Sequence, residues 1–127
     1  MPHILVVDDD DLIRDVLYDF LMEEGYQVSL ARDGNEALAV LEHEHNLVVL
    51  LDLTMPGLNG AGVIDALQAT RRDDHQIVII TAGRHAALER RWVQQGQVQA
   101  VLHKPFNIDK LLALVQQLAQ VRSTVAD

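Results

Sequence analysis

Charged and hydroxyl side chains follow four apolar segments of this sequence, at the point where each segment ends. They are Asp8 and Asp9 after "ILVV" (4–7), Asp52 after "LVVLL" (47–51), Thr81 after "IVII" (77–80) and Lys104 after "AVLH" (100–103). Carboxylates held close together repel one another unless a cation neutralises them. Carboxylate oxygens are hard ligands, which select Mg²⁺ or Mn²⁺. These residue types therefore indicate a site for a divalent cation.

Phosphoryl transfer is the chemistry that suits such a set. With a divalent cation bound, Asp52 could act as a nucleophile and form an aspartyl phosphate. Lys104 would supply positive charge to the phosphoryl oxygens, and the Thr81 hydroxyl would supply a hydrogen bond. Each residue alone is weak evidence, because an Asp after a strand is usually a turn or cap residue. Their occurrence at four strand ends makes the prediction.

The elements that position these residues are short strands. The sequence predicts five of them, at 4–7, 27–31, 47–51, 77–80 and 100–103. Three runs (4–7, 47–51 and 77–80) are apolar at every position, which is typical of strands covered on both faces of a parallel sheet.

Amphipathic segments separate the strands and predict five helices. These cover residues 12–24, 34–44, 62–72, 85–95 and about 107–121. Asp10 or Asp11 is expected to cap the first helix, and Asn107 or Asp109 lies near the start of the last. Alternating strands and helices predict an α/β fold with a parallel sheet, open and doubly wound because a barrel needs about twice this length. Ligands bind such sheets beyond the carboxyl ends of the strands.

Composition limits the class of protein. The chain has 127 residues, 10 Lys and Arg against 19 Asp and Glu, a formal charge of −9 and no Cys. This charge argues against direct binding of nucleic acid or an anionic membrane. Without Cys there is no disulfide or thiolate metal site. Apolar runs are too short for a membrane span, and the start does not resemble a signal peptide, so we expect a cytoplasmic location. We expect one domain over 1–122 and a C-terminal tail or linker stub at 123–127.

The sequence resembles the receiver domain of bacterial two-component response regulators over nearly its whole length. The resemblance is carried by "ILVVDDDDLIRDVL", "GYQVSLARDGNEAL", "LLDLTMPGLNG", "IITA" and "HKPF". The third segment is the most specific, because Asp is followed by Met-Pro-Gly and a later Gly. The resemblance implies a flavodoxin-like (βα)5 fold, a doubly wound five-stranded parallel sheet with strand order 2-1-3-4-5.

The resemblance also assigns roles to particular residues. It implies that Asp52 is the phosphoacceptor. It implies that Mg²⁺ (or Mn²⁺) is held by Asp8, Asp9, Asp52 and the backbone carbonyl of Thr54. The Thr81 hydroxyl would move onto the phosphoryl group, and Lys104 would form an ion pair with it. The Lys104–Pro105 peptide is expected to be cis. The protein would be a phosphorelay signalling domain that catalyses only its own phosphorylation and dephosphorylation.

The implied partners are a histidine kinase or histidine phosphotransfer protein as donor and an output domain or effector protein as target. Phosphorylation would switch the face made by the fourth helix, fifth strand and fifth helix, and this face could also form a homodimer. The sequence departs from the family at Val101, where receivers often carry Tyr or Phe.

Other interpretations remain beside this one. A receiver-like module could bind partners without phosphorylation, and a phosphatase could work through an aspartyl intermediate, although such enzymes usually place an acid where Thr54 stands. A flavin carrier would not place "DDDD" near a phosphate. Trp92 is expected to face the core with Leu88, the alternative being an exposed anchor for a partner.

Overall fold

The fold is taken from a computed structural model, which describes residues 2–55, 59–83 and 85–126, with side chains described as far as residue 120. Within these residues the strands are β1 (His3–Val7), β2 (Gln27–Ala31), β3 (Val48–Asp52), β4 (Gln76–Thr81) and β5 (Ala100–His103). The helices are α1 (Asp11–Glu23), α2 (Gly34–His43), α3 (Gly60–Ala69), α4 (Ala86–Gln94) and α5 (Ile108–Ala126). Strands and helices alternate along the chain, as predicted.

The five described strands form one parallel sheet in the order β2-β1-β3-β4-β5. This confirms the predicted flavodoxin-like doubly wound fold. The register pairs Val7 with Leu51, Asp52 with Ile80, and Thr81 with His103. The strands that precede the candidate residues therefore end at the same edge of the sheet.

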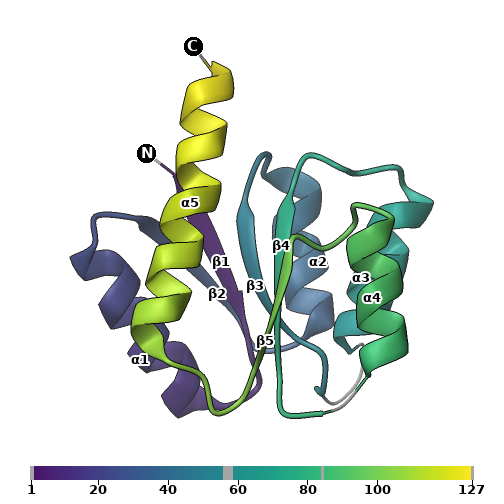
Figure 1. Ribbon diagram of the computed structural model, residues 1–127, viewed down its shortest axis with the longest axis horizontal. Coiled ribbons are helices and arrows are strands. Elements are labelled where there is room, and N and C mark those ends of the chain that lie inside the picture. Colours follow the sequence, from purple (N-terminus) through teal and green to yellow (C-terminus); the bar gives the residue numbers. More distant parts are fainter. Residues whose placement is uncertain (1, 56–58, 84, 127) are drawn as a thin grey trace.

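Helices cover both faces of the sheet, with α1 and α5 on one side and α2, α3 and α4 on the other (Figure 1). Successive strand residues alternate between two buried clusters. Leu5 and Val7 of β1 pack with the α2, α3 and α4 side, whereas Ile4 and Val6 pack with α1 and α5. Because both faces are buried, β1, β3 and β4 are apolar almost throughout.

Side-chain caps fix where several helices begin. Asp10 rather than Asp11 caps α1, since its carboxylate accepts from the N–H groups of Leu12 and Ile13 at 2.9 and 3.2 Å. Asn107 caps the start of α5 through the N–H groups of residues 109 and 110. None of the described helices is long and apolar enough to span a lipid bilayer.

The bounds of α3 and α5 differ most from the prediction. Helix α3 starts at Gly60 instead of residue 62, because the Asn59 side chain accepts from Gly62 N–H at 3.0 Å. It ends at Ala69 instead of residue 72. Arg71 has a positive φ of 56°, which a right-handed helix does not contain. Helix α5 continues to Ala126, beyond the predicted end at about 121. The predicted division at 122 and 123 stays a prediction.

His75, which the sequence interpretation did not consider, joins three elements in the interior. Its Nδ1 accepts from Leu47 N–H at 3.1 Å, so the ring proton lies on Nε2, which donates to the Leu41 carbonyl at 3.0 Å. The ring thus ties the end of α2 to the starts of β3 and β4. Its side chain is 1% exposed, so water cannot replace these bonds.

We expect His75→Ala to lower the free energy of unfolding by about 2–4 kcal/mol, because a buried donor and a buried acceptor lose their partner. Urea denaturation followed by circular dichroism measures this change. His43→Ala is the matched control, since His43 is exposed and bonds only the Ala39 carbonyl of its own helix in the described contacts. Equal losses in the two variants would contradict the structural role of His75.

Candidate functional site

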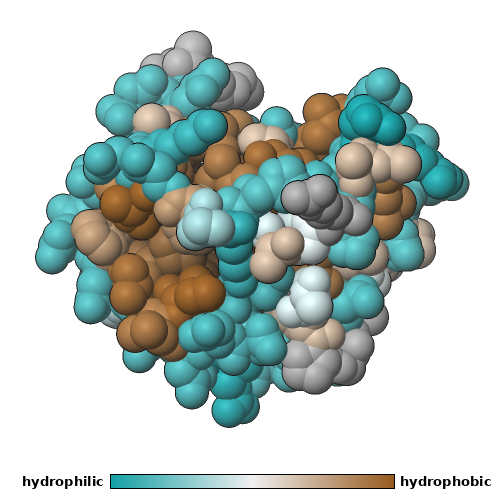
Figure 2. Space-filling view, turned by 60° about the horizontal axis from the view of Figure 1, so that its bottom comes forward, coloured by the Kyte–Doolittle hydropathy of each residue, from teal (hydrophilic) through white to brown (hydrophobic). Residues whose placement is uncertain are grey.

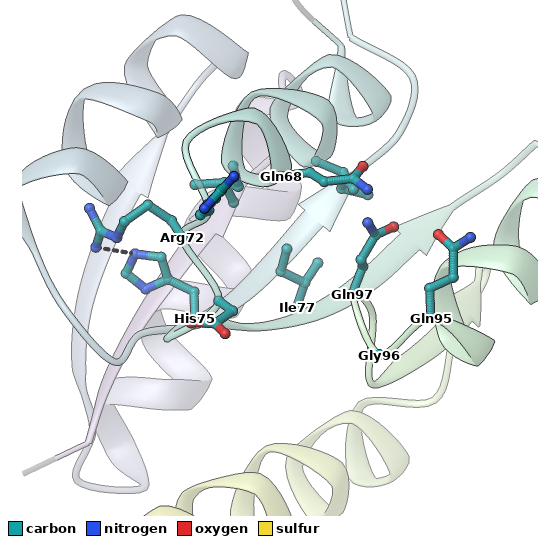
Figure 3. Close-up of a pocket in the computed structure, with 11 residues that line it drawn as sticks. Gln68, Arg72, His75, Ile77, Gln95, Gly96 and Gln97 are labelled. Atoms are coloured by element: carbon teal, nitrogen blue, oxygen red, sulfur yellow. Dashed lines mark hydrogen bonds between the residues drawn. The ribbon is translucent and has the colours of Figure 1, made fainter.

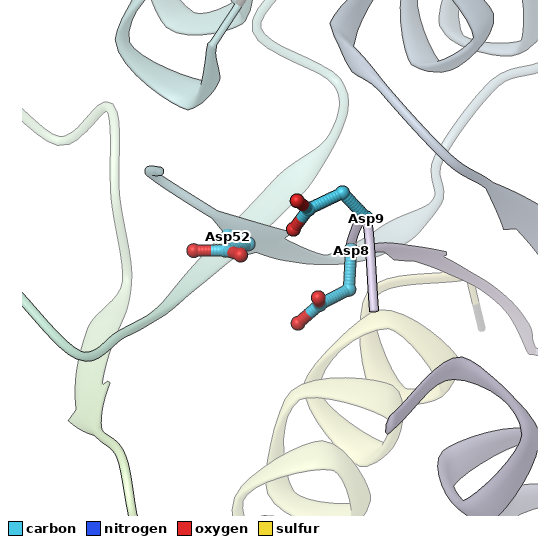
Figure 4. A group of neighbouring side chains, drawn as sticks. All are labelled: Asp8, Asp9 and Asp52. Atoms are coloured by element: carbon cyan, nitrogen blue, oxygen red, sulfur yellow. The ribbon is translucent and has the colours of Figure 1, made fainter. Parts of the chain in front are cut away.

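Asp8, Asp9 and Asp52 lie together where β1 and β3 end. One carboxylate oxygen of each lies within 4.8 Å of the others. Figure 4 shows the carboxylates of Asp8 and Asp9 turned to the side on which Asp52 lies. Asp8 and Asp52 are 3% and 4% exposed, whereas Asp9 is exposed to solvent. Two buried carboxylates and one accessible carboxylate form a donor set that suits a hard divalent cation.

Lys104 reaches this acidic group from the end of β5. Its Nζ lies 2.9 Å from Asp8 Oδ2 and 3.4 Å from Asp52 Oδ2. The Lys104–Pro105 peptide is cis, as expected. The ammonium is thus held close to one carboxylate oxygen of each of these two aspartates.

Thr81 is fully buried at the end of β4, next to Lys104 along the edge. The Lys104 N–H donates to the Thr81 carbonyl at 2.8 Å, which continues the β4–β5 pairing by one residue. Thr81 Oγ1 accepts from Gly83 N–H at 3.1 Å, so its hydroxyl proton is still available to another acceptor. All the side chains predicted from strand ends are therefore found at one edge.

Backbone donors orient the two buried carboxylates. Asp10 N–H donates to Asp8 Oδ1 at 2.9 Å, and Thr54 N–H donates to Asp52 Oδ1 at 3.0 Å. Each carboxylate thus has one oxygen held by backbone and the other, Oδ2, turned toward Lys104. Thr54, predicted as a ligand through its carbonyl, follows Asp52 closely enough for its own amide to fix that side chain.

The pKa values reflect burial together with this crowding. Burial raises the pKa of Asp52 above its ordinary value; Thr54 N–H opposes this, Asp8 reinforces it and Lys104 opposes it. Burial of the ammonium lowers the pKa of Lys104, but the carboxylates of Asp8 and Asp52 outweigh it and raise that pKa overall. The pKa of Asp52 is raised overall although Lys104 pairs with it, because burial is the largest of these causes.

Arg14 and Gly60 support the site; the sequence interpretation gave Arg14 no role and regarded Gly60 only as the later Gly of the family motif. The buried Arg14 guanidinium donates to the backbone carbonyl of Asp8 at 2.6 Å and pairs with the Asp11 carboxylate. A Cβ at Gly60 would lie 2.5 Å from the carbonyl oxygen of Asp52, so α3 can begin there only without a side chain. The available signal for Arg14 was its spacing of three residues from Asp11, and the signal for Gly60 was its place in the family motif.

A separate hollow of about 330 Å³ lies near the start of β4, away from the acidic group. Figure 3 shows Gln68, Gln95 and Gln97 around it, with Ile77 at its floor. None of the predicted site residues lines it. The acidic edge, and not this hollow, is the candidate functional site.

Apolar side chains are exposed beside the acidic edge. Figure 2, turned so that this edge comes forward, shows hydrophobic residues gathered on one side of the face. Leu12, Val16 and Phe20 of α1 are 71%, 41% and 39% exposed, and their spacing of four residues places them on one stripe of the helix. Such a stripe is typical of a surface that binds another protein.

Trp92 is buried in α4, at 4% exposure, and belongs to the same cluster as Val63 and Ile64. This confirms the expectation that it faces the core, and it is wrong to regard it as an exposed anchor. Val101, where the resemblance led us to expect an aromatic residue, is partly buried against the same cluster.

Known proteins with similar sequences are response regulators. A family model described as the response regulator receiver domain matches residues 4–116. Response regulator MprA of Mycolicibacterium vanbaalenii is 40% identical over 128 residues, which cover 100% of this chain and 54% of that protein. The chain therefore spans about half the length of this curated relative.

Solved structures of receiver domains share the fold. The receiver domain of Francisella response regulator 1452 has a TM-score of 0.86 at 28% identity, covering 96% of this chain and 99% of that one. Response regulator TrrA of Thermotoga maritima, solved in complex with Mg²⁺ and BeF, has a TM-score of 0.78 at 35% identity, covering 93% and 99%.

We expect Asp52→Asn to raise the free energy of unfolding near neutral pH without divalent ions, by on the order of 1 kcal/mol. The pKa of Asp52 is raised in the fold, so folding favours the protonated form and the carboxylate becomes more costly as pH rises through and above the ordinary Asp range. The gain should therefore shrink in mild acid. Urea denaturation at several pH values measures it.

Asp9→Asn is the matched control for this prediction, because Asp9 belongs to the same group but is exposed. Without divalent ions its effect should be small. A variant Asp52→Asn that is less stable than the natural chain near neutral pH would contradict the expected repulsion.

Proposed function

The chain belongs to the response regulator receiver family, and from this we propose that it accepts a phosphoryl group on Asp52 from phosphohistidine. The observation that carries the proposal is the position of Asp52: its carboxylate is buried among Asp8, Asp9 and Lys104 at the edge where parallel strands end. One oxygen is held by Thr54 N–H. The other oxygen faces Lys104, and the exposed Asp9 belongs to the same group of carboxylates.

The transfer itself is a displacement at phosphorus. Asp52 Oδ2, as the carboxylate, forms the new P–O bond while the P–N bond of the donor breaks, and the electron pair leaves on the imidazole nitrogen. The Lys104 ammonium stabilises the negative charge on the phosphoryl oxygens. The Thr81 hydroxyl accepts from Gly83 N–H and can therefore donate a hydrogen bond to one of those phosphoryl oxygens.

Asp8, Asp9, Asp52 and the carbonyl of Thr54 are proposed to hold Mg²⁺ or Mn²⁺. Three carboxylate oxygens within 4.8 Å of one another support this, since they repel each other without a cation. The TrrA relative was solved with Mg²⁺ and BeF. The ion, when bound, would neutralise developing charge on the phosphoryl group.

Two surfaces support the proposed partners. The apolar stripe of Leu12, Val16 and Phe20 lies beside the acidic edge, where a histidine kinase or phosphotransfer protein must present its phosphohistidine. The face of α4, β5 and α5 would then bind an output domain, an effector or a second copy. Because the curated relative is about twice as long, this chain would act within or beside a larger protein. The protein would lie in the cytoplasm and would catalyse only its own phosphorylation and dephosphorylation.

We expect incubation with acetyl phosphate and Mg²⁺ to add the mass of one phosphoryl group, measured by intact-protein mass spectrometry. Asp52→Asn should remove the adduct, and a chelator should prevent it. Lys104→Ala should still give some adduct at a lower rate, because the nucleophile remains.

Asp65→Asn is the matched control, since Asp65 is exposed on α3, away from the acidic group. It should be labelled like the natural chain. An adduct that persists in Asp52→Asn would contradict the assignment of the acceptor. An adduct of equal yield with chelator would contradict the metal site.

A further inference from the structure

A buried carboxylate on α4 has no role in the proposed transfer. Glu89 is 6% exposed and is one of few buried charged residues among those described. A buried carboxylate is costly unless hydrogen bonds compensate for its lost hydration. The contacts of Glu89 therefore show what keeps it inside.

Glu89 bridges the residue just before α4 and the end of β5. Its Oε2 accepts from the backbone N–H of His85, just before α4, at 3.2 Å. Its Oε1 lies 3.2 Å from Nε2 of His103 on β5. A carboxylate only accepts, so the His103 proton in this contact lies on Nε2. One side chain thus holds both the start of α4 and the end of β5.

Both segments touch the phosphoryl site. His103 is opposite Thr81 in the β4–β5 register and precedes Lys104. The His85 ring lies over Gly83, since a Cβ at Gly83 would meet His85 Nε2 at 2.7 Å. Gly83 in turn donates its N–H to Thr81 Oγ1. A continuous series of contacts therefore runs from the Thr81 hydroxyl to Glu89 and back to β5.

Apolar packing between α4 and β5 is sparse at this point. A hollow of about 410 Å³ lies between them, lined by Ala86, Glu89, Arg90, Val93, Gln94 and Val101. Val101 is short and has no polar atom with which to follow a change at Thr81. The bridge made by Glu89 spans this gap.

We propose that Glu89 is a positioning residue through which a change at Thr81 reaches α4 and β5. The proposal rests on the proposed function, because it needs Thr81 to turn toward a phosphoryl group on Asp52. When the hydroxyl moves, the Gly83 amide and the His85 segment move with it. Because Glu89 is hydrogen-bonded to both His85 and His103, the displacement of His85 is passed to His103, and α4 and β5 shift together.

The single tryptophan of the chain provides a direct readout. Trp92 lies on α4, three residues from Glu89, and is buried. Fluorescence of Trp92 therefore reports a shift of α4, while intact-protein mass spectrometry after acetyl phosphate with Mg²⁺ reports loading of Asp52. The two measurements separate transfer from its consequence.

In the natural chain we expect loading to change Trp92 fluorescence. His103→Ala, at an exposed position that should not disturb folding, should load to the same extent and lose most of the fluorescence change. Glu89→Ala should do the same, and the two variants combined should lose no more than either alone. Glu89→Gln keeps one acceptor oxygen for the His85 N–H, and its NH2 group can donate to Nε2 of the other His103 tautomer, so it should retain much of the response. Arg90→Ala, exposed on the same helix, is the matched control and should respond fully.

The outcomes distinguish the two proposals. No adduct in the natural chain would contradict the proposed function and this inference with it. Loading without a fluorescence change in the natural chain, or with an undiminished change in both His103→Ala and Glu89→Ala, would overturn the role of Glu89 alone. Lower stability of Glu89→Ala with an unaltered response would show that the bridge is merely structural.

Discussion

The contact between the Lys104 ammonium and the carboxylates of Asp8 and Asp52 is the interaction on which the site depends. It joins three strands, because Asp8 follows β1, Asp52 ends β3 and Lys104 follows β5. The buried carboxylates of Asp8 and Asp52, which have oxygens within 4.8 Å of each other, could not both stay ionised without a positive charge nearby. Parallel strands ending at one edge are what allow a residue near position 8 and another near position 104 to meet.

The positions of these residues could be predicted because they follow from a local pattern and one rule of topology. Runs of apolar residues mark strands buried on both faces, and the side chain after each run must lie at the carboxyl edge. The residues Asp8, Asp52, Thr81 and Lys104 could be placed this way without knowing the strand order. The order itself came from the family resemblance, since neither pattern nor length decides which strand lies next to β1.

Residues whose burial depends on distant partners could not be predicted. His75 sits between Asp74 and Gln76 in a polar stretch, and its bonds to the backbone groups of the distant residues Leu41 and Leu47 help to hold it in the interior. Glu89 belongs to the polar side of an amphipathic pattern, yet β5 turns it inward. Helix α3 begins two residues earlier than predicted because the Asn59 side chain caps it. The sequence alone did not show which polar residue of this loop acts as the cap.

Gly60 sets a limit on what the chemistry-bearing residues can reveal about related sequences. Its missing side chain lets α3 begin against the backbone of Asp52 and Leu53. A chain that gained a methyl group here would keep every acid, the hydroxyl and the lysine, but the helix would have to move away from the backbone of Asp52 and Leu53. A sequence could therefore keep every chemistry-bearing residue of this edge and still hold the carboxylate equivalent to Asp52 out of place.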